Sequence, residues 1–321
     1  MKRSLLLITL IATMVLTACA GVSVSSEEKE LVLATGGTGG TYFAVGSAMS
    51  TVFNPKLEKS DLSVLSTGGS KENIQLLSDK EAKLAIVQND VMYYAYSGTD
   101  LFAEEGQFEK FSAVAGLYDE TVQIVTCDES LKTVADLKGK TVSVGDAGSG
   151  TEFNSRQILE AYGMSFDDIN VVNASFADSA AALGTGKIDA AIIVAGAPTK
   201  AVTELAEEKG IRLIEMDAEH IRILQSKYLF YKETTIPKDI YEGLPADSTT
   251  VSVRATLVAS DKVSTDQVYE LTKMLFEENG SLASAHKELE SLTPESALVG
   301  LSIPLHPGAK KYYDEAGLQA E

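Results

Sequence analysis

Residues 35–43, Thr-Gly-Gly-Thr-Gly-Gly-Thr-Tyr-Phe, offer one kind of chemistry above all, which is a run of unobstructed backbone N–H groups. The apolar run 31–34 before them predicts a strand, and apolar residues at helical spacing after residue 41 predict a helix. A glycine-rich turn between a strand and a helix N-terminus suits an anion, because the N–H groups and the helix dipole both attract negative charge. Glycine also lets a ligand come close to the backbone.

Three interpretations of this turn compete. A dinucleotide-binding fingerprint, Gly-x-Gly-x-x-Gly, would start at Gly37 and Gly39, but its last position is Tyr42. A phosphate-binding P-loop would end in Lys followed by Ser or Thr, and the turn contains no Lys. An ordinary structural turn remains open from these residues alone.

Three further turns of small or polar residues follow expected strands, at 66–70, 88–90 and 148–151. Ligands of open α/β sheets bind beyond the carboxyl ends of strands, so four such turns favour one binding cleft. Hydroxyl and N–H groups would hold a carboxylate, and the polar turn 88–90 would accept hydrogen bonds from an ammonium or amide. The candidate binding residues are Gly37, Thr38, Gly39, Thr41, Tyr42, Ser66, Thr67, Gly68, Ser70, Gln88, Asn89, Asp90, Ser149, Gly150, Thr151 and Gly196.

The source of positive charge for an anion is not obvious from the sequence. The turns at 35–41, 66–70 and 148–151 contain no Lys or Arg, so N–H groups and helix dipoles would supply the attraction. Arg156 is the nearest basic candidate, and the alternative is that it is an exposed surface residue. The net charge of the chain is −19, which argues against nucleic acid as a partner.

Patterns for catalysis or metal binding are missing from the sequence. His220, His286 and His306 stand far apart and belong to no catalytic or metal-binding motif. Cys127 has no adjacent basic residue and is expected to be a small buried side chain. We therefore expect no enzymatic activity, no metal and no cofactor.

The elements that position the turns alternate strand and helix, which predicts an α/β fold with a largely parallel sheet. A length of 321 residues suggests two lobes. We expect strands at 111–116 and 121–126, Ser70 as a helix N-cap and Pro198 in the first turn of a helix. The expected first lobe is 29–117 plus 252–321 and the second is 118–251, with a hinge at the two crossings.

The N-terminal segment 1–19 has the features of a secretion signal. Lys2 and Arg3 precede an apolar run at 5–15, and Leu-Thr-Ala-Cys ending at Cys19 resembles a bacterial lipobox. An ordinary signal peptide with an incidental cysteine is the alternative. We expect a lipid on Cys19, a flexible tether at 20–28, and an extracytoplasmic monomer attached to the membrane only through that lipid.

The turn at 35–43 resembles the opening motif of the TAXI family, whose members are solute-binding subunits of TRAP (tripartite ATP-independent periplasmic) transporters. Asn89 departs from the pattern, because relatives more often have Ser there. The Asp-Leu-Lys-Gly-Lys part of the motif at 134–140 is shared by many periplasmic binding proteins. Further segments that resemble the family, in family order, are 66–73, 85–90, 134–140, 148–151, 186–190, 196–198 and 304–309.

This resemblance implies a type II periplasmic-binding-protein fold, in which two α/β lobes joined by a hinge close on a ligand in the cleft. It also implies delivery of a small carboxylate, such as glutamate, glutamine or a related acid, to a TRAP membrane permease driven by an ion gradient. A lipid-anchored sensor of the same fold that feeds a signalling receptor is the alternative function.

Overall fold

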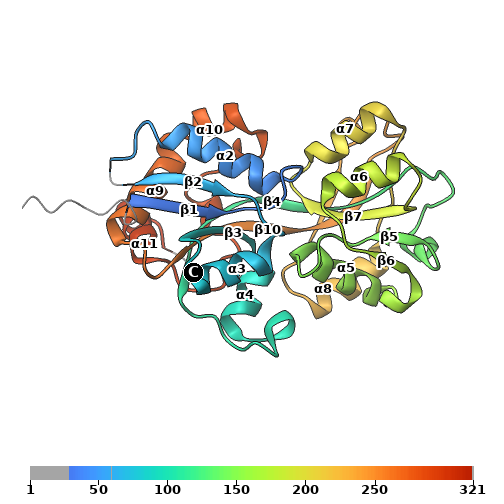
Figure 1. Ribbon diagram of the computed structural model, residues 1–321, viewed down its shortest axis with the longest axis horizontal. Coiled ribbons are helices and arrows are strands. Elements are labelled where there is room, and N and C mark those ends of the chain that lie inside the picture. The colour runs from blue at the N-terminus through green and yellow to red at the C-terminus, as the bar shows by residue number, and fades with distance from the viewer. Residues whose placement is uncertain (1–28, 59, 320–321) are drawn as a thin grey trace, which may run out of the picture.

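The computed structural model describes residues 29–58 and 60–319, which form two α/β lobes side by side along the longest axis (Figure 1). The expected signal peptide, the tether and Cys19 lie outside the described residues. Within the described ranges, no helix has both the length and the apolar character needed to cross a membrane.

A single sheet runs through both lobes in the order β2-β1-β3-β10-β4-β7-β5-β6, while β8 pairs with β4 and β9 pairs with β10. β1 pairs in parallel with β2 and β3, and β5 pairs in parallel with β6 and β7, as expected for strands joined by helices. The strands are β1 (Glu30–Ala34), β2 (Asp61–Leu65), β3 (Leu84–Gln88), β4 (Phe111–Thr126), β5 (Thr141–Ser143), β6 (Asn170–Val172), β7 (Ala190–Ala195), β8 (Arg212–Leu213), β9 (Lys232–Ile236) and β10 (Ser248–Ser260).

Helices cover both faces of the sheet in each lobe, which gives the two-lobed arrangement predicted from the sequence (Figure 1). The apolar core of the first lobe includes Leu31, Ile86, Leu257 and Tyr313, so both ends of the described chain contribute to it. The helices are α2 (Thr41–Phe53), α3 (Ser70–Asp79), α4 (Asn89–Ser97), α5 (Gly150–Ala161), α6 (Phe176–Gly184), α7 (Lys200–Glu208), α8 (Ala218–Lys227), α9 (Thr265–Glu277), α10 (Asn279–Ala285) and α11 (Pro307–Glu315).

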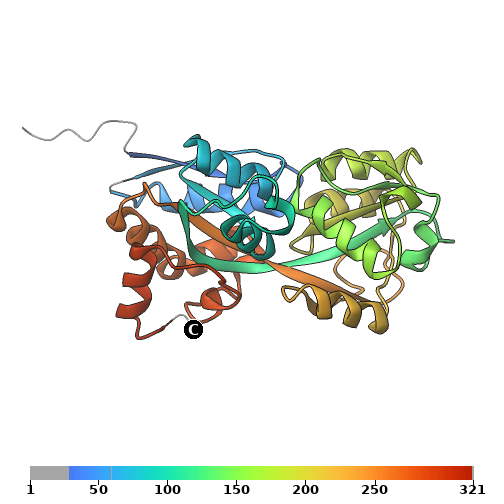
Figure 2. The same cartoon turned by 90° about the horizontal axis from the view of Figure 1, so that it is seen from below.

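Two long antiparallel strands, β4 and β10, connect the lobes (Figure 2). The prediction of separate strands at 111–116 and 121–126 is therefore wrong, because β4 continues through the charged residues Asp119 and Glu120. Pairing with β10 keeps these residues in the strand. The register shifts between Ala255 and Thr256, opposite Leu117, and such a bulge bends the strand where the lobes meet.

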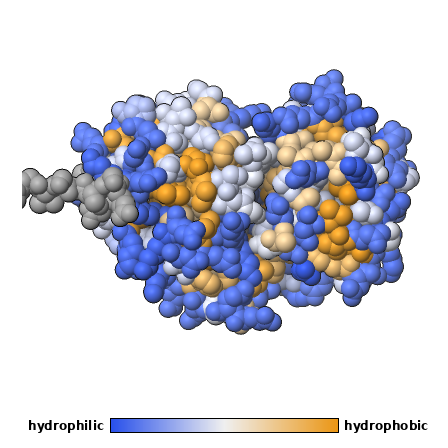
Figure 3. All heavy atoms as spheres, viewed as in Figure 1, coloured by the Kyte–Doolittle hydropathy of each residue, from blue (hydrophilic) through white to orange (hydrophobic). Residues whose placement is uncertain are grey.

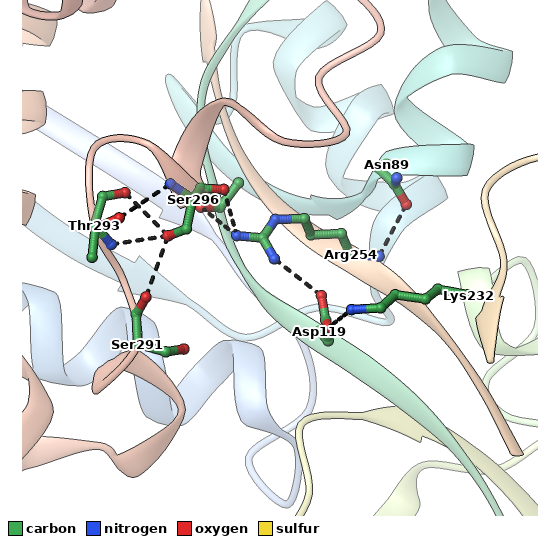
Figure 4. Close-up of polar contacts among 8 residues, drawn as sticks. Asn89, Asp119, Lys232, Arg254, Ser291, Thr293 and Ser296 are labelled. Atoms are coloured by element: carbon green, nitrogen blue, oxygen red, sulfur yellow. Dashed lines mark hydrogen bonds and ion pairs between the residues drawn. The ribbon is translucent and has the colours of Figure 1, made fainter. Parts of the chain in front are cut away.

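An arginine holds this junction together (Figure 4). The Arg254 guanidinium on β10 donates to Asp119 Oδ1 on β4 at 3.0 Å and to the Ser296 carbonyl at 2.8 Å. A Cβ on Gly116 would lie 2.5 Å from Arg254 Nε, so glycine is required beside the guanidinium. Lys232 makes a longer contact, 3.6 Å, with the other Asp119 oxygen.

Local predictions differ from the structure at three helix starts. Ser70 is the first residue of α3 and not its N-cap, because Gly69 precedes it with φ of 112°, a value that favours glycine. Residues 88–90 are not a turn, since β3 ends at Gln88 and α4 begins at the next residue. Pro198 lies before α7, whose N-cap is Thr199.

Candidate ligand-binding cavity

A cavity of about 400 Å³ lies between the lobes, at the carboxyl ends of β1, β2 and β3. At the centre of Figure 3, pale residues of intermediate hydropathy occupy the junction of the two lobes. A volume of this size is typical of a small-molecule site. The first lobe lines the cavity with residues 36–42 and 66–70 and Gln88, and the second lobe does so with Asp146, residues 149–151 and 175–177, Val194 and Ala195. Glu120 lines it from β4, one of the two strands that cross between the lobes.

In the described part of the chain, four helices begin at the cavity wall, namely α2, α3, α5 and α6. The N-cap residues of α2 and α3, Gly40 and Gly69, make no side-chain hydrogen bond to the first turn. Those helix starts therefore keep N–H groups for a ligand, and their dipoles add partial positive charge. Among the described residues that line the cavity, none is Lys or Arg. The cavity is thus arranged to attract an anion without a cationic side chain.

Glycine allows the two lobes to come into contact around the cavity. A Cβ on Gly39 would lie 3.2 Å from the Ala177 side chain, and one on Gly40 would lie 3.3 Å from the Phe176 ring. On the opposite side, a Cβ on Gly150 would lie 1.8 Å from Gln88 Oε1. Since each of these contacts joins one lobe to the other, the structure represents a closed arrangement.

A buried acid, Glu120, forms part of the wall and was not predicted from the sequence. Its side chain comes from β4 and is 2% exposed, and the Tyr42 hydroxyl donates to its Oε2 at 2.7 Å. Burial raises the pKa of Glu120 well above its usual value, and the nearby Asp90 and Glu288 carboxyls raise it further. The sequence offered one signal, a carboxylate within an apolar run, but the expected break in the strand hid it.

A second carboxyl group, that of Asp146, lies at the edge of the cavity on the second lobe. Its side chain is half-buried, and this burial raises its pKa, with a smaller contribution from Asp178 and Glu72. The cavity therefore combines helix N-termini with two acids. Within the described ranges no cluster of three or more His, Cys, Asp or Glu residues could hold a metal ion.

Most of the predicted binding residues come together at this cavity, although they are distant in sequence. Asn89, Asp90 and Gly196 do not line it. Asn89 Oδ1 accepts from the Arg254 N–H at 3.0 Å, and the Gly196 carbonyl accepts from Thr41 Oγ1 at 3.3 Å. The predicted residues that do line it are Gly37, Thr38, Gly39, Thr41, Tyr42, Ser66, Thr67, Gly68, Ser70, Gln88, Ser149, Gly150 and Thr151.

A buried polar contact joins the lobes next to the cavity. Asn154 on α5 donates from Nδ2 to Asp90 Oδ2 at 2.9 Å and accepts at Oδ1 from Gln88 Nε2 at 2.9 Å. The same Nδ2 donates to the Tyr231 hydroxyl at 2.7 Å. Burial raises the pKa of Asp90 to about 6, although the Asn154 hydrogen bond opposes the shift.

A family model described as the NMT1-like family matches residues 33–317. The chain belongs to the NMT1-like family. This match covers both lobes and the whole cavity lining. The narrower resemblance to the TAXI family, which rests on short motifs, remains a proposal.

Solved structures with the same fold include periplasmic binding proteins. The alkanesulfonate-binding protein SsuA from Xanthomonas axonopodis pv. citri, bound to MOPS, is 15% identical with a TM-score of 0.50, covering 89% of this chain and 90% of that one. A structure from Streptococcus mutans, described in terms of glutathione import through GshT and the cystine ABC importer TcyBC, is 16% identical with a TM-score of 0.50, covering 88% and 99%. A protein from Bordetella bronchiseptica RB50 is 18% identical with a TM-score of 0.54, covering 92% and 91%. The predicted periplasmic-binding-protein fold is thereby confirmed.

Proposed function

We propose that this NMT1-like protein is an extracytoplasmic solute-binding protein that captures a small carboxylate by lobe closure and delivers it to a membrane permease. The observation that carries the proposal is the cavity between the lobes, where several helices begin and no basic side chain is present among the described lining residues. N–H groups at helix starts bind a carboxylate with fixed geometry and need no reorganisation. The expected lipid on Cys19 would hold the protein beside its permease.

The direct test is mass spectrometry of the small molecules that the tag-free protein retains through purification. We expect a small carboxylate in stoichiometric amount. Small-angle scattering before and after its removal and re-addition would then show compaction with ligand, as hinge closure requires. Retention of no small anion, together with failure to bind any in a thermal-shift panel, would contradict the proposed function.

The type of permease separates two versions of this function. The motif resemblance supports a TRAP permease driven by an ion gradient, whereas the Streptococcus mutans structure is described with an ABC importer. Uptake of the retained solute should be measured in cells that contain the protein and its permease. Collapse of the ion gradient at constant ATP should stop uptake through a TRAP permease, and depletion of ATP at constant gradient should stop an ABC importer.

If N–H groups at helix starts hold the carboxylate, which we call the helix-terminus mechanism, the side chains that matter for affinity can be predicted. Thr151 lies in the first turn of α5 and lines the cavity, so Thr151→Ala should weaken binding by about 1–3 kcal/mol, the usual effect of leaving a buried polar partner unmade. Arg156 is on the same helix, but it pairs with Glu152 at 3.0 Å and lies over the Phe166 ring. Arg156→Ala should therefore leave the affinity nearly unchanged.

Isothermal titration calorimetry with the recovered solute measures both variants. A large loss of affinity in Arg156→Ala together with a small loss of affinity in Thr151→Ala would mean that an ion pair holds the anion. The helix-terminus mechanism would then be wrong.

A further inference from the structure

Glu120 is unusual because its carboxyl group is buried at the wall of the cavity with no cationic partner among the residues that the structure describes. Within the described residues, the Tyr42 hydroxyl is its hydrogen-bond partner, and it accepts that bond at Oε2. No ion pair to Lys, Arg or His involves Glu120 in the described ranges. Buried carboxylates normally have a positive partner, because an uncompensated charge is costly away from water.

The groups around Glu120 cannot supply that partner. Tyr42 from α2 and Tyr118 on its own strand are neutral, and burial raises the pKa of both hydroxyls well above the usual value. The other titratable groups that act on it are Asp90 and Glu288, which are acids. If Glu120 is ionised, its positive partner therefore comes from the cavity.

We propose that Glu120 receives the protonated amine of a zwitterionic ligand of the amino-acid class, whose carboxylate lies at the starts of the helices. This inference rests on the proposed function and names the ligand more narrowly. The cavity has an acceptor and donors on its walls, with Glu120 on β4 and the N-termini of α2, α3 and α5 among the lining. An ammonium group donates in three directions, so Oε1 of Glu120 can accept one bond while Tyr42 keeps Oε2.

This assignment replaces the acceptor expected from the sequence, which was the segment 88–90. Asp90 already accepts from Asn154 Nδ2 and lies outside the cavity lining. Gln88 does line the cavity, but it has no negative charge. Among the described residues that line the cavity, the carboxyl groups are those of Glu120 on the crossing strand β4 and of Asp146 on the second lobe.

A neutral role for Glu120 is the competing interpretation. A protonated Glu120 would donate a hydrogen bond to a carboxylate, and the ligand would then need no amine. The substitution Glu120→Gln separates these roles, because the amide can still donate and still accept from Tyr42 but has no negative charge.

The experiment compares ligands as well as variants. Ligand-free protein, prepared by unfolding and refolding, is titrated with the common L-amino acids and with the amine-free acid of each, for example L-glutamate against glutarate. We expect one amino acid to bind roughly 10–100-fold more tightly than its amine-free analogue, the range for a charge-assisted hydrogen bond in a buried site. Glu120→Gln should remove that preference.

Glu288→Gln is the matched control. Glu288 is an acid whose burial raises its pKa to about 7, and it contacts the second lobe near Gly196, but it lies outside the cavity lining. This variant should keep the preference for the amine. The proposal is overturned if the wild-type protein binds an amine-free acid as tightly as the amino acid, if no amino acid binds, or if Glu120→Gln retains the preference.

The comparison of ligands in the unmodified protein tests the preference for an amine even if Glu120→Gln fails to fold. Tight binding of an amine-free acid would overturn the role of Glu120 and leave the proposed solute-binding function intact. Binding of no small anion at all would instead overturn the proposed function.

Discussion

Gly150→Ala is expected to abolish ligand binding, with a loss of more than about 1,000-fold, while both lobes remain folded. The new Cβ would lie 1.8 Å from Gln88 Oε1 and 2.6 Å from Gln88 Cδ. Gln88 is buried and donates to Asn154, so its side chain cannot move aside without breaking that bond. The lobes would therefore be unable to reach their closed arrangement.

The same substitution should not harm the second lobe by itself. Gly150 is the first residue of α5 and its φ is not positive, so alanine fits its backbone conformation and favours the helix by up to about 1 kcal/mol. The melting temperature of the ligand-free variant should equal or exceed that of the wild type. Scattering should show no compaction when the recovered solute is added.

A double-mutant cycle with Gln88→Ala tests whether the clash is the cause. Once the Gln88 amide is gone, Gly150→Ala should cost little further affinity. If Gly150→Ala still abolishes ligand binding in the Gln88→Ala background, the new methyl group displaces the ligand itself. If Gly150→Ala alone binds ligand with wild-type affinity, the Gln88 side chain moves aside freely.

The sequence contained enough information for the fold class and for most of the cavity wall. Glycine-rich turns after apolar runs, such as 35–41 and 148–151, are local signals, and the ends of parallel strands necessarily meet at one edge of a sheet. For this reason thirteen of the sixteen proposed binding residues line one cavity.

The predicted residues that do not line the cavity have partners far away in the sequence. Asn89 accepts from the N–H of Arg254, and Asp90 accepts from Asn154 in the other lobe. The three polar residues 88–90 looked like a turn in the sequence, whereas they are buried residues at the end of β3 and the start of α4. Glu120 was missed because the continuity of β4 comes from pairing with β10. No local pattern in the sequence encodes such contacts.

The requirement for glycine at residue 150 shows the same limit. From the sequence, Gly150 is one small residue in a turn, and a ligand is the obvious reason for it. The structure adds a different reason, which is the Gln88 side chain of the opposite lobe. Gly150 can thus serve lobe closure as well as ligand binding, and the double-mutant cycle with Gln88→Ala separates these two roles.

Asn154→Leu is expected to weaken binding by about 100-fold or more, although Asn154 does not line the cavity. The substitution removes the group that donates to Asp90 Oδ2 and accepts from Gln88 Nε2 in the closed arrangement. When the lobes open, water would satisfy both partners, so the cost falls on the closed state alone. Calorimetry and dissociation kinetics should show a faster release of ligand.

Tyr241→Phe is a suitable control, since its buried hydroxyl bonds to the Thr199 N–H and to Gln123 within the second lobe. It should lower the melting temperature and leave affinity unchanged. An equal loss of affinity in both variants would mean that general destabilisation, and not the contact between lobes, is responsible.

The pH dependence of closure gives a second measurement of the Asn154 contact. In the closed state burial raises the pKa of Asp90 to about 6, above its ordinary value of 3.8, so the closed state binds the proton more tightly than a solvated open state. Asp90 therefore favours closure as pH falls from about 6 toward 4, and its contribution is lost as pH rises through 6.

Two variants test this change of ligand affinity with pH. The Asn154 hydrogen bond lowers the pKa of Asp90, so Asn154→Leu should move the change to higher pH, and Asp90→Asn should remove it. If the dependence of affinity on pH is the same in wild type and Asp90→Asn, the protonation of Asp90 is not coupled to closure.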